Sequence, residues 1–134
     1  MNETGQKSGG ALILVVERNP VVQRLERYLL EQAGFGVAFA SDGISALALA
    51  LELRPVLIVT EVLVPRLDGF SICRALRADD RTRGSFIVVL SHLDAEDRAL
   101  AAGADAFVLK PLGADILIER VSALLNSREN EVTK

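Results

Sequence analysis

The feature that most constrains the fold is a regular alternation between short apolar runs and longer amphipathic stretches. Each run is four or five residues long and rich in Val, Ile and Phe. Most runs are apolar at consecutive positions, which is typical of a strand whose sheet is covered on both faces. The predicted strands are Leu12–Val16, Val37–Ala40, Val56–Thr60, Phe86–Leu90 and Ala106–Leu109.

Helix start signals follow each of the predicted strands. Asn19-Pro20 joins a capping residue to proline at the first helical position, and Gly34 provides a stop. Val22, Leu25 and Leu29 mark the predicted buried face of this first helix. The other predicted helices begin at Ser41–Gly43, Asp68-Gly69, Leu93-Asp94 and Gly113-Ala114, and the second and fourth end at Arg54-Pro55 and near Gly103.

This order of elements predicts an α/β fold in which a strand and a helix are repeated five times. Parallel strands need crossover connections, and right-handed crossovers place helices on both faces of the sheet. Five strands are too few for the eight-stranded barrel, so we expect an open, doubly wound sheet. In such a sheet, ligands bind at the carboxyl ends of the strands.

Length and charge set the domain organisation and exclude several kinds of function. The 134 residues predict one domain at 11–126, between a disordered N-terminal tail (1–10) and a polar C-terminal tail or linker (127–134). A net charge of -3 without a basic stripe argues against nucleic-acid binding by this domain. One cysteine excludes an internal disulfide, and no apolar run suits a membrane span or a signal peptide. We therefore expect a cytoplasmic protein without membrane contact.

Four of the predicted strands end in side chains that carry charge or hydrogen-bonding groups. Glu17 and Arg18 follow the first strand, Glu61 the third, Ser91 the fourth and Lys110-Pro111 the fifth. Because parallel strands end at one edge of a sheet, we expect these side chains to meet in one crevice. The first strand–helix turn lacks the glycines that bring backbone amides against phosphate, which argues against dinucleotide and nucleoside triphosphate binding.

The order of these motifs resembles the receiver domains of two-component response regulators, from about Leu12 to Leu125. The matching segments are Leu12–Pro20, Pro55–Gly69, Val88–Ser91 and Gly103–Pro111. The resemblance implies a flavodoxin-like sheet with strand order 2-1-3-4-5. It also implies that Ser91 and Phe107 are the hydroxyl and aromatic switch residues, and that Lys110 and Pro111 are the family's Lys-Pro pair.

The chain departs from the family pattern at the positions that carry its chemistry. The family's phosphoacceptor aspartate aligns with Glu61, and its acidic metal-binding pair aligns with Glu17 and Arg18. Magnesium prefers carboxylate and water oxygens, so the Arg18 guanidinium should repel it. We therefore predict no metal, no cofactor, no catalytic residue and no phosphorylation by small phosphodonors.

The predicted function is that of an atypical receiver, a non-enzymatic module that binds a signalling protein in bacteria without phosphorylation. In this interpretation Glu61 imitates phospho-aspartate, Lys110 pairs with it, and Arg18 supplies positive charge. Two alternatives stay open. The charged residues could be a relic ion cluster, or the chain could be a phosphorylatable receiver with residual magnesium-dependent phosphotransfer. The expected partner is a kinase, an output domain or an adaptor.

The predicted fourth helix, fifth strand and fifth helix carry a mixed-charge surface that is the candidate interface for a partner or a homodimer. Its residues are Asp97, Arg98, Asp105, Glu119 and Arg120. We expect His92 at an exposed rim and Cys73 in the core as an inert thiol. A hydrolase site at Ser91, His92 and Asp94 is disfavoured because no strained nucleophile turn surrounds them.

Overall fold

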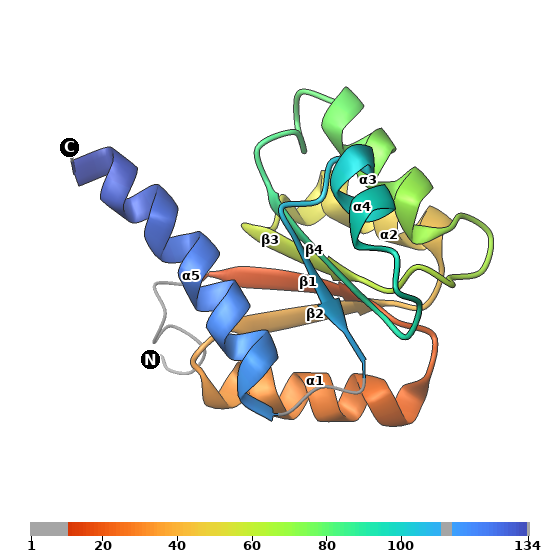
Figure 1. Cartoon of the computed structure of the whole chain (residues 1–134), viewed down its shortest axis with the longest axis horizontal. Helices are drawn as coiled ribbons and strands as arrows, with labels where there is room; N and C mark the ends of the chain where they lie inside the picture. The colour runs from red at the N-terminus through yellow and green to blue at the C-terminus, as the bar shows by residue number, and fades with distance from the viewer. Residues whose placement is uncertain (1–10, 111–113, 134) are drawn as a thin grey trace.

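A computed structural model of the chain describes residues 11–110 and 114–133. Its sheet has five parallel strands in the order β2-β1-β3-β4-β5, which confirms the predicted fold (Figure 1). The strands are β1 (Leu12–Val16), β2 (Gly36–Ala40), β3 (Leu57–Thr60), β4 (Phe86–Ser91) and β5 (Ala106–Leu109). Each observed strand end lies within one residue of its predicted position.

The helices of the described residues are α1 (Pro20–Gln32), α2 (Gly43–Leu53), α3 (Gly69–Ala78), α4 (Glu96–Ala102) and α5 (Ala114–Thr133). Three of them begin at capping side chains within the predicted start signals. Asn19 accepts a hydrogen bond from the Val21 amide at 2.9 Å, and Asp42 accepts one from the Ser45 amide at 2.8 Å. Asp68 likewise accepts from the Ser71 amide at 3.0 Å. Each cap satisfies an amide that the first helical turn leaves without an intrahelical partner.

The start of α4 and the end of α5 differ from the prediction. The fourth helix begins at Glu96 rather than at Leu93-Asp94, and its start has no side-chain cap. The fifth helix continues to Thr133, through most of the segment predicted as a polar tail. The predicted tail at 1–10, and Pro111, lie outside the described residues.

Arg128 makes contacts from the part of α5 that lies past residue 126. The Arg128 guanidinium donates a hydrogen bond to the Gly84 carbonyl at 2.7 Å and lies 4.2 Å from the centroid of the Phe86 ring. A cation over an aromatic face is stabilising, and here it ties the helix to the start of β4. The role of the last residues as a linker stays a prediction.

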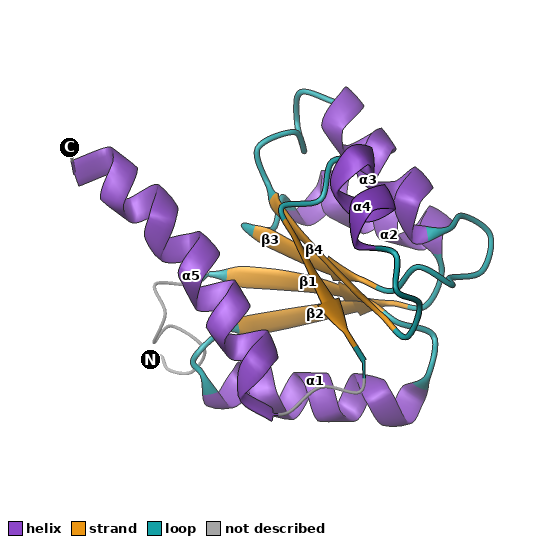
Figure 2. Ribbon diagram, viewed as in Figure 1, coloured by secondary structure: helices purple, strands orange, loops and turns teal. Residues whose placement is uncertain are grey.

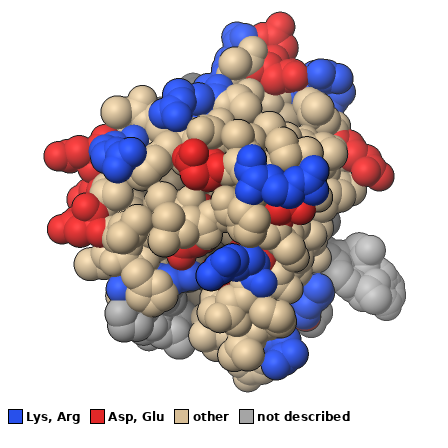
Figure 3. Space-filling view, turned by 90° about the vertical axis from the view of Figure 1, so that its right-hand side faces the viewer, with Lys and Arg blue, Asp and Glu red and all other residues tan. Residues whose placement is uncertain are grey.

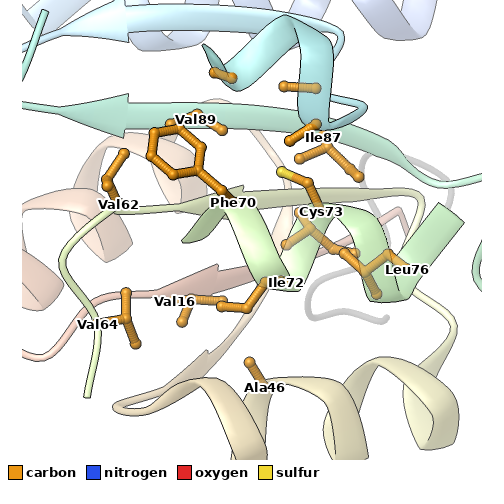
Figure 4. Close-up of a cluster of buried hydrophobic side chains, with 14 of the residues drawn as sticks. Val16, Ala46, Val62, Val64, Phe70, Ile72, Cys73, Leu76, Ile87 and Val89 are labelled. Carbon is orange, nitrogen blue, oxygen red and sulfur yellow. The ribbon is translucent and has the colours of Figure 1, made fainter. Parts of the chain in front are cut away.

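The helices cover both faces of the sheet, with α1 and α5 on one face and α2, α3 and α4 on the other (Figure 2). Each face has its own core cluster. In the cluster under α2–α4, Phe70, Ile72 and Cys73 of α3 lie among strand side chains such as Val89 (Figure 4). Burial raises the pKa of the Cys73 thiol to about 11, so Cys73 is the inert core residue that the sequence predicts.

The strand register brings the predicted site residues to one edge of the sheet. Val16 of β1 pairs with Thr60 of β3, and Thr60 pairs with Val89 of β4. Ser91, at the end of β4, pairs with Leu109 of β5. The residues that follow these pairs therefore leave the sheet at the same edge, where the strands have their carboxyl ends. Within the described ranges, every helix is too short or too polar to cross a membrane.

Candidate functional site

The Lys110 side chain joins two carboxylates at the carboxyl ends of three strands. Its Nζ donates to Glu17 Oε1 at 2.8 Å and to Glu61 Oε1 at 3.1 Å. The three side chains are 8%, 6% and 9% exposed, so the whole cluster is withdrawn from water. The backbone amide of Lys110 also donates to the Ser91 carbonyl at 2.8 Å, which holds this end of β5 against β4. The structure thus brings together Glu17, Glu61 and Lys110, as the sequence predicts.

Both oxygens of the Glu61 carboxylate are engaged. Oε1 accepts from Lys110, and Oε2 accepts from the amides of Val62 at 2.7 Å and Leu63 at 3.3 Å. Burial raises the pKa of Glu61, but the neighbouring Ser91 hydroxyl, the Lys110 ammonium and the Val62 amide outweigh it and lower the pKa. Glu61 therefore carries a negative charge at neutral pH.

Glu17 is fixed on the other side of the lysine. Its Oε2 accepts from the Asn19 amide at 3.1 Å, and its carbonyl accepts from the Gln23 side-chain amide. Burial lowers the pKa of Lys110, but the hydrogen bonds and charges of Glu17 and Glu61 prevail and raise it. Lys110 stays protonated, and the two carboxylates with one ammonium have a net charge of about -1.

Gly69 holds the segment after β3 in place by a close backbone approach. A Cβ atom at Gly69 would lie 2.4 Å from the Glu61 carbonyl oxygen and 2.9 Å from the Val62 Cα. The Gly69 amide donates to the Val62 carbonyl at 2.9 Å. Only glycine fits this contact, so Asp68-Gly69 both starts α3 and positions Glu61. The sequence indicates the first role and misses the second.

Arg18 stands apart from the buried cluster. Its side chain is exposed and lines a hollow of about 210 Å³ that Glu17, Glu61 and Lys110 also line. Among the described residues, no ion pair joins Arg18 to either carboxylate. Figure 3 views the molecule from the side on which α1 begins and shows basic and acidic side chains interspersed. The cation that pairs with Glu61 is therefore the Lys110 ammonium, as the sequence predicts, and not the Arg18 guanidinium.

These residues do not fit a magnesium ion. Mg²⁺ demands near-octahedral oxygen ligands, usually one or two carboxylates with several waters. Glu17 and Glu61 direct their oxygens at the Lys110 ammonium and at backbone amides, and the second acidic position of the family pattern is Arg18. In the part of the chain that the structure describes, no three His, Cys, Asp or Glu side chains form a group that could hold a metal.

The two predicted switch residues are both buried. Ser91 is 0% exposed, and its Oγ accepts from the Leu93 amide at 3.2 Å. Phe107 is 7% exposed and belongs to the core cluster under α2–α4, so its ring faces inward. His92 is exposed, as the sequence predicts.

The candidate interface residues differ in how freely they could contact a partner. Asp105 pairs with Arg77 at 2.8 Å and also accepts from the Ile87 amide at 2.8 Å, so it is a structural residue. Arg120 donates to the Phe107 carbonyl at 3.1 Å, and Arg98 lies 4.5 Å from the centroid of the Phe70 ring. Asp97, Asp105 and Glu119 are all exposed, and Asp105 is the one of the three that the bonds above hold in place.

Glu26 of α1 is a buried acid that sequence reasoning misses. It is 4% exposed, whereas Leu25, predicted to be buried, is 55% exposed. The spacing of four residues to the fully buried Leu30 is the signal that could have identified it. Burial, and then the charges of Glu17 and Glu61, raise the pKa of Glu26 to about 7. Its Oε1 has no hydrogen-bond partner among the described residues.

The sequence matches known signalling proteins over most of its length. It is 37% identical over 116 residues to the DNA-binding dual master transcriptional regulator RpaA of Synechocystis sp., covering 84% of this chain and 48% of that protein. The chain spans about half the length of the curated relatives that it matches.

The fold is also that of solved receiver domains. The receiver domain of a signal transduction histidine kinase from Syntrophus aciditrophicus superposes with a TM-score of 0.82 at 30% identity, covering 88% of this chain and 92% of that one. The receiver domain of sensor histidine kinase PA1611 from Pseudomonas aeruginosa, which has a magnesium ion in its active-site cleft, gives 0.75 at 32% identity, covering 84% and 93%. The family model of the response regulator receiver domain matches residues 13–122, so the chain belongs to that family.

Proposed function

We propose that this receiver domain acts as a phosphorylation-independent binding module in bacterial two-component signalling. Receiver domains are signalling modules rather than classical enzymes, and this one uses a fixed ion cluster in place of a phosphoryl group. The observation that carries the proposal is that both oxygens of the Glu61 carboxylate accept hydrogen bonds. Lys110 donates to one oxygen, and two backbone amides donate to the other.

The geometry supports the absence of phosphotransfer. In-line attack on a phosphoryl group needs a free nucleophile placed to about an ångström and a cation that neutralises developing charge. The glutamate at position 61 extends one bond, about 1.5 Å, further than an aspartate, and its oxygens are already bound. The two carboxylates share the Lys110 ammonium, and Arg18 stands where the family has a second acidic ligand.

The same cluster supports a single signalling conformation. Glu61 stays ionised, and Lys110 is tied to it at 3.1 Å. The Phe107 ring is already inward, which is the orientation that the family couples to the active hydroxyl position. A carboxylate that no phosphatase removes would hold the domain in this form permanently.

The partner surface of the proposal is formed by α4, β5 and α5. Leu100 of α4 is 44% exposed and Leu109 of β5 is 49% exposed, and Asp97 of α4 and Glu119 of α5 are exposed as well. Such a mixture of apolar and charged side chains suits a protein partner, either a signalling protein or a second copy of this chain. RpaA is named as DNA-binding, but with a net charge of -3 we assign protein contacts and no DNA contacts to this domain.

Incubation with acetyl phosphate and magnesium tests the proposal, with intact mass as the readout. We expect no phosphoryl adduct on the unaltered chain and none on Glu61→Asp, which still lacks the second acidic ligand. The double variant Glu61→Asp with Arg18→Asp should gain one phosphoryl group. The PA1611 receiver domain serves as a magnesium-binding control.

Two outcomes would contradict the proposal. An acid-stable adduct mapped to Glu61 would show that the longer carboxylate is a working acceptor. Labelling of Glu61→Asp alone would show that Arg18 does not matter for the metal site, and would favour a receiver that retains magnesium-dependent phosphotransfer.

A further inference from the structure

A second cavity lies on the other side of Lys110, between α1 and α5. Its volume is about 190 Å³, and the first turns of α5 lie beside α1 at this place (Figure 1). Most of the wall is apolar, and the polar lining comes from one acid, one histidine and one lysine. The lining residues are Val22, Leu25, Glu26, Leu29, His92, Lys110 and Leu117.

The polar group that distinguishes this cavity is the carboxyl of Glu26. The residue is 96% buried, and its Oε1 meets no donor among the described residues. A buried polar atom without a partner is costly, so native structures rarely retain one without a ligand, an ion or water. Glu26 takes no part in the Lys110 cluster's hydrogen bonds and is not required by the proposed function.

The charges around Glu26 favour a ligand that carries a positive charge. The groups that face it are Glu17 at the end of β1, Glu61 at the end of β3, Lys110 after β5 and His92 after β4. The Lys110 ammonium is already shared by Glu17 and Glu61 at 2.8 and 3.1 Å. Ionisation of Glu26 would therefore add an uncompensated negative charge, which a ligand with one positive charge would neutralise.

We propose that the α1–α5 cavity is a binding site for a small amphipathic cation, an ammonium or amidinium group on an apolar body. The cation pairs with the Glu26 carboxylate, and the body packs against Val22, Leu29 and Leu117. An apolar cavity of about 150 Å³ accepts benzene, so about 190 Å³ accommodates a benzene-sized body with a short polar arm. This site goes beyond the proposed function and does not depend on it.

Titration of the whole ¹⁵N-labelled chain with benzylamine, followed by ¹H–¹⁵N spectra, tests the site. We expect saturable shifts at amides of α1 around Glu26 and at Leu117. Only the ionised carboxylate pairs with the ammonium, and the pKa of Glu26 is about 7. The apparent affinity should therefore rise about tenfold from pH 6 to pH 8, as the ionised fraction rises. Benzyl alcohol, which has the same ring and no charge, should bind at least tenfold more weakly.

Two variants complete the test. Glu26→Gln should lose at least tenfold in benzylamine affinity and lose the pH dependence. Glu31→Gln, which removes an exposed acid of the same helix, should bind as the unaltered chain does. Equal binding of benzylamine and benzyl alcohol, shifts located only in the hollow near Arg18, or unchanged binding by Glu26→Gln would each overturn the proposal.

Discussion

Replacing Glu26 by glutamine is expected to stabilise the protein at neutral and alkaline pH. The side chain is 96% buried, and its pKa is raised from an ordinary 4.5 to about 7. Because one pKa unit corresponds to about 1.4 kcal/mol, the ionised carboxylate lowers the free energy of unfolding by about 3 kcal/mol. Glutamine has nearly the same shape and no charge, so it should remove this penalty.

The effect has a defined pH window. Below about pH 4.5 Glu26 is protonated in the folded and unfolded states, so the substitution changes little. Between pH 4.5 and 7 the unfolded chain releases the proton while the folded protein retains it, and the unaltered protein loses stability. Above about pH 7 that loss is complete. Glu61, whose pKa is lowered, loses its stabilising contribution only as pH falls below its ordinary value of 4.5, which lies outside this window.

Urea unfolding at pH 5, 6, 7 and 8, followed by circular dichroism, measures the effect. We expect the gain from Glu26→Gln to be small at pH 5 and to reach about 3 kcal/mol at pH 8, with an unchanged m-value. Glu31→Gln is the matched control, since Glu31 is half exposed in a surface pair with Arg27. A gain that does not vary with pH, or a loss at pH 8, would refute the description of Glu26 as a buried acid with a raised pKa.

Three other substitutions test the site and its support. Lys110→Met should cost about 3–5 kcal/mol in urea unfolding at pH 7.5 and less at pH 5, because it leaves two buried carboxylates unpaired; an equal loss at both pH values would contradict this. Gly69→Ala should cost about 1–3 kcal/mol and shift the amide signals of Glu61 and Val62, since the new Cβ meets the Glu61 carbonyl; unchanged spectra would argue against the close approach. Arg77→Met should lower the unfolding free energy by about 2 kcal/mol or more, because Arg77 bonds three carbonyls and Asp105; an unchanged thermal midpoint would contradict it.

The order of elements was predictable because each step depends on local chemistry. A strand that is apolar at consecutive positions, such as Leu12–Val16, needs a sheet that is covered on both faces. Such burial is typical of a parallel sheet. The caps at Asn19 and Asp68 bond amides two or three residues away, so the sequence itself contains the whole interaction.

The features that sequence reasoning missed depend on contacts between distant segments. The continuation of α5 beyond residue 126 is tied to Arg128 meeting Gly84, 44 residues earlier in the chain. The exposure of Leu25 and the burial of Glu26 reverse the rule that apolar residues lie inside. That rule assigns the buried face of a helix by residue type. The position of α1 over the sheet decides instead which of its residues, Leu25 or Glu26, faces inward.

The convergence of Glu17, Glu61 and Lys110 followed from topology, and the pairing of Lys110 with Glu61 was predictable too, whereas the exposed position of Arg18 was not. The sequence also suggests that Arg18 supplies positive charge near Glu61, but the Arg18 side chain is exposed. Arg18 lies at a bend just after β1, where Glu17 is buried and the Arg18 side chain is exposed. Lys110 reaches Glu61 because β4 and β5 are held in register and its own amide bonds Ser91. We therefore expect that Glu61→Asp alone leaves Arg18 at the position that aligns with the family's second acidic residue, and that Arg18→Asp is needed as well to supply a second carboxylate for magnesium.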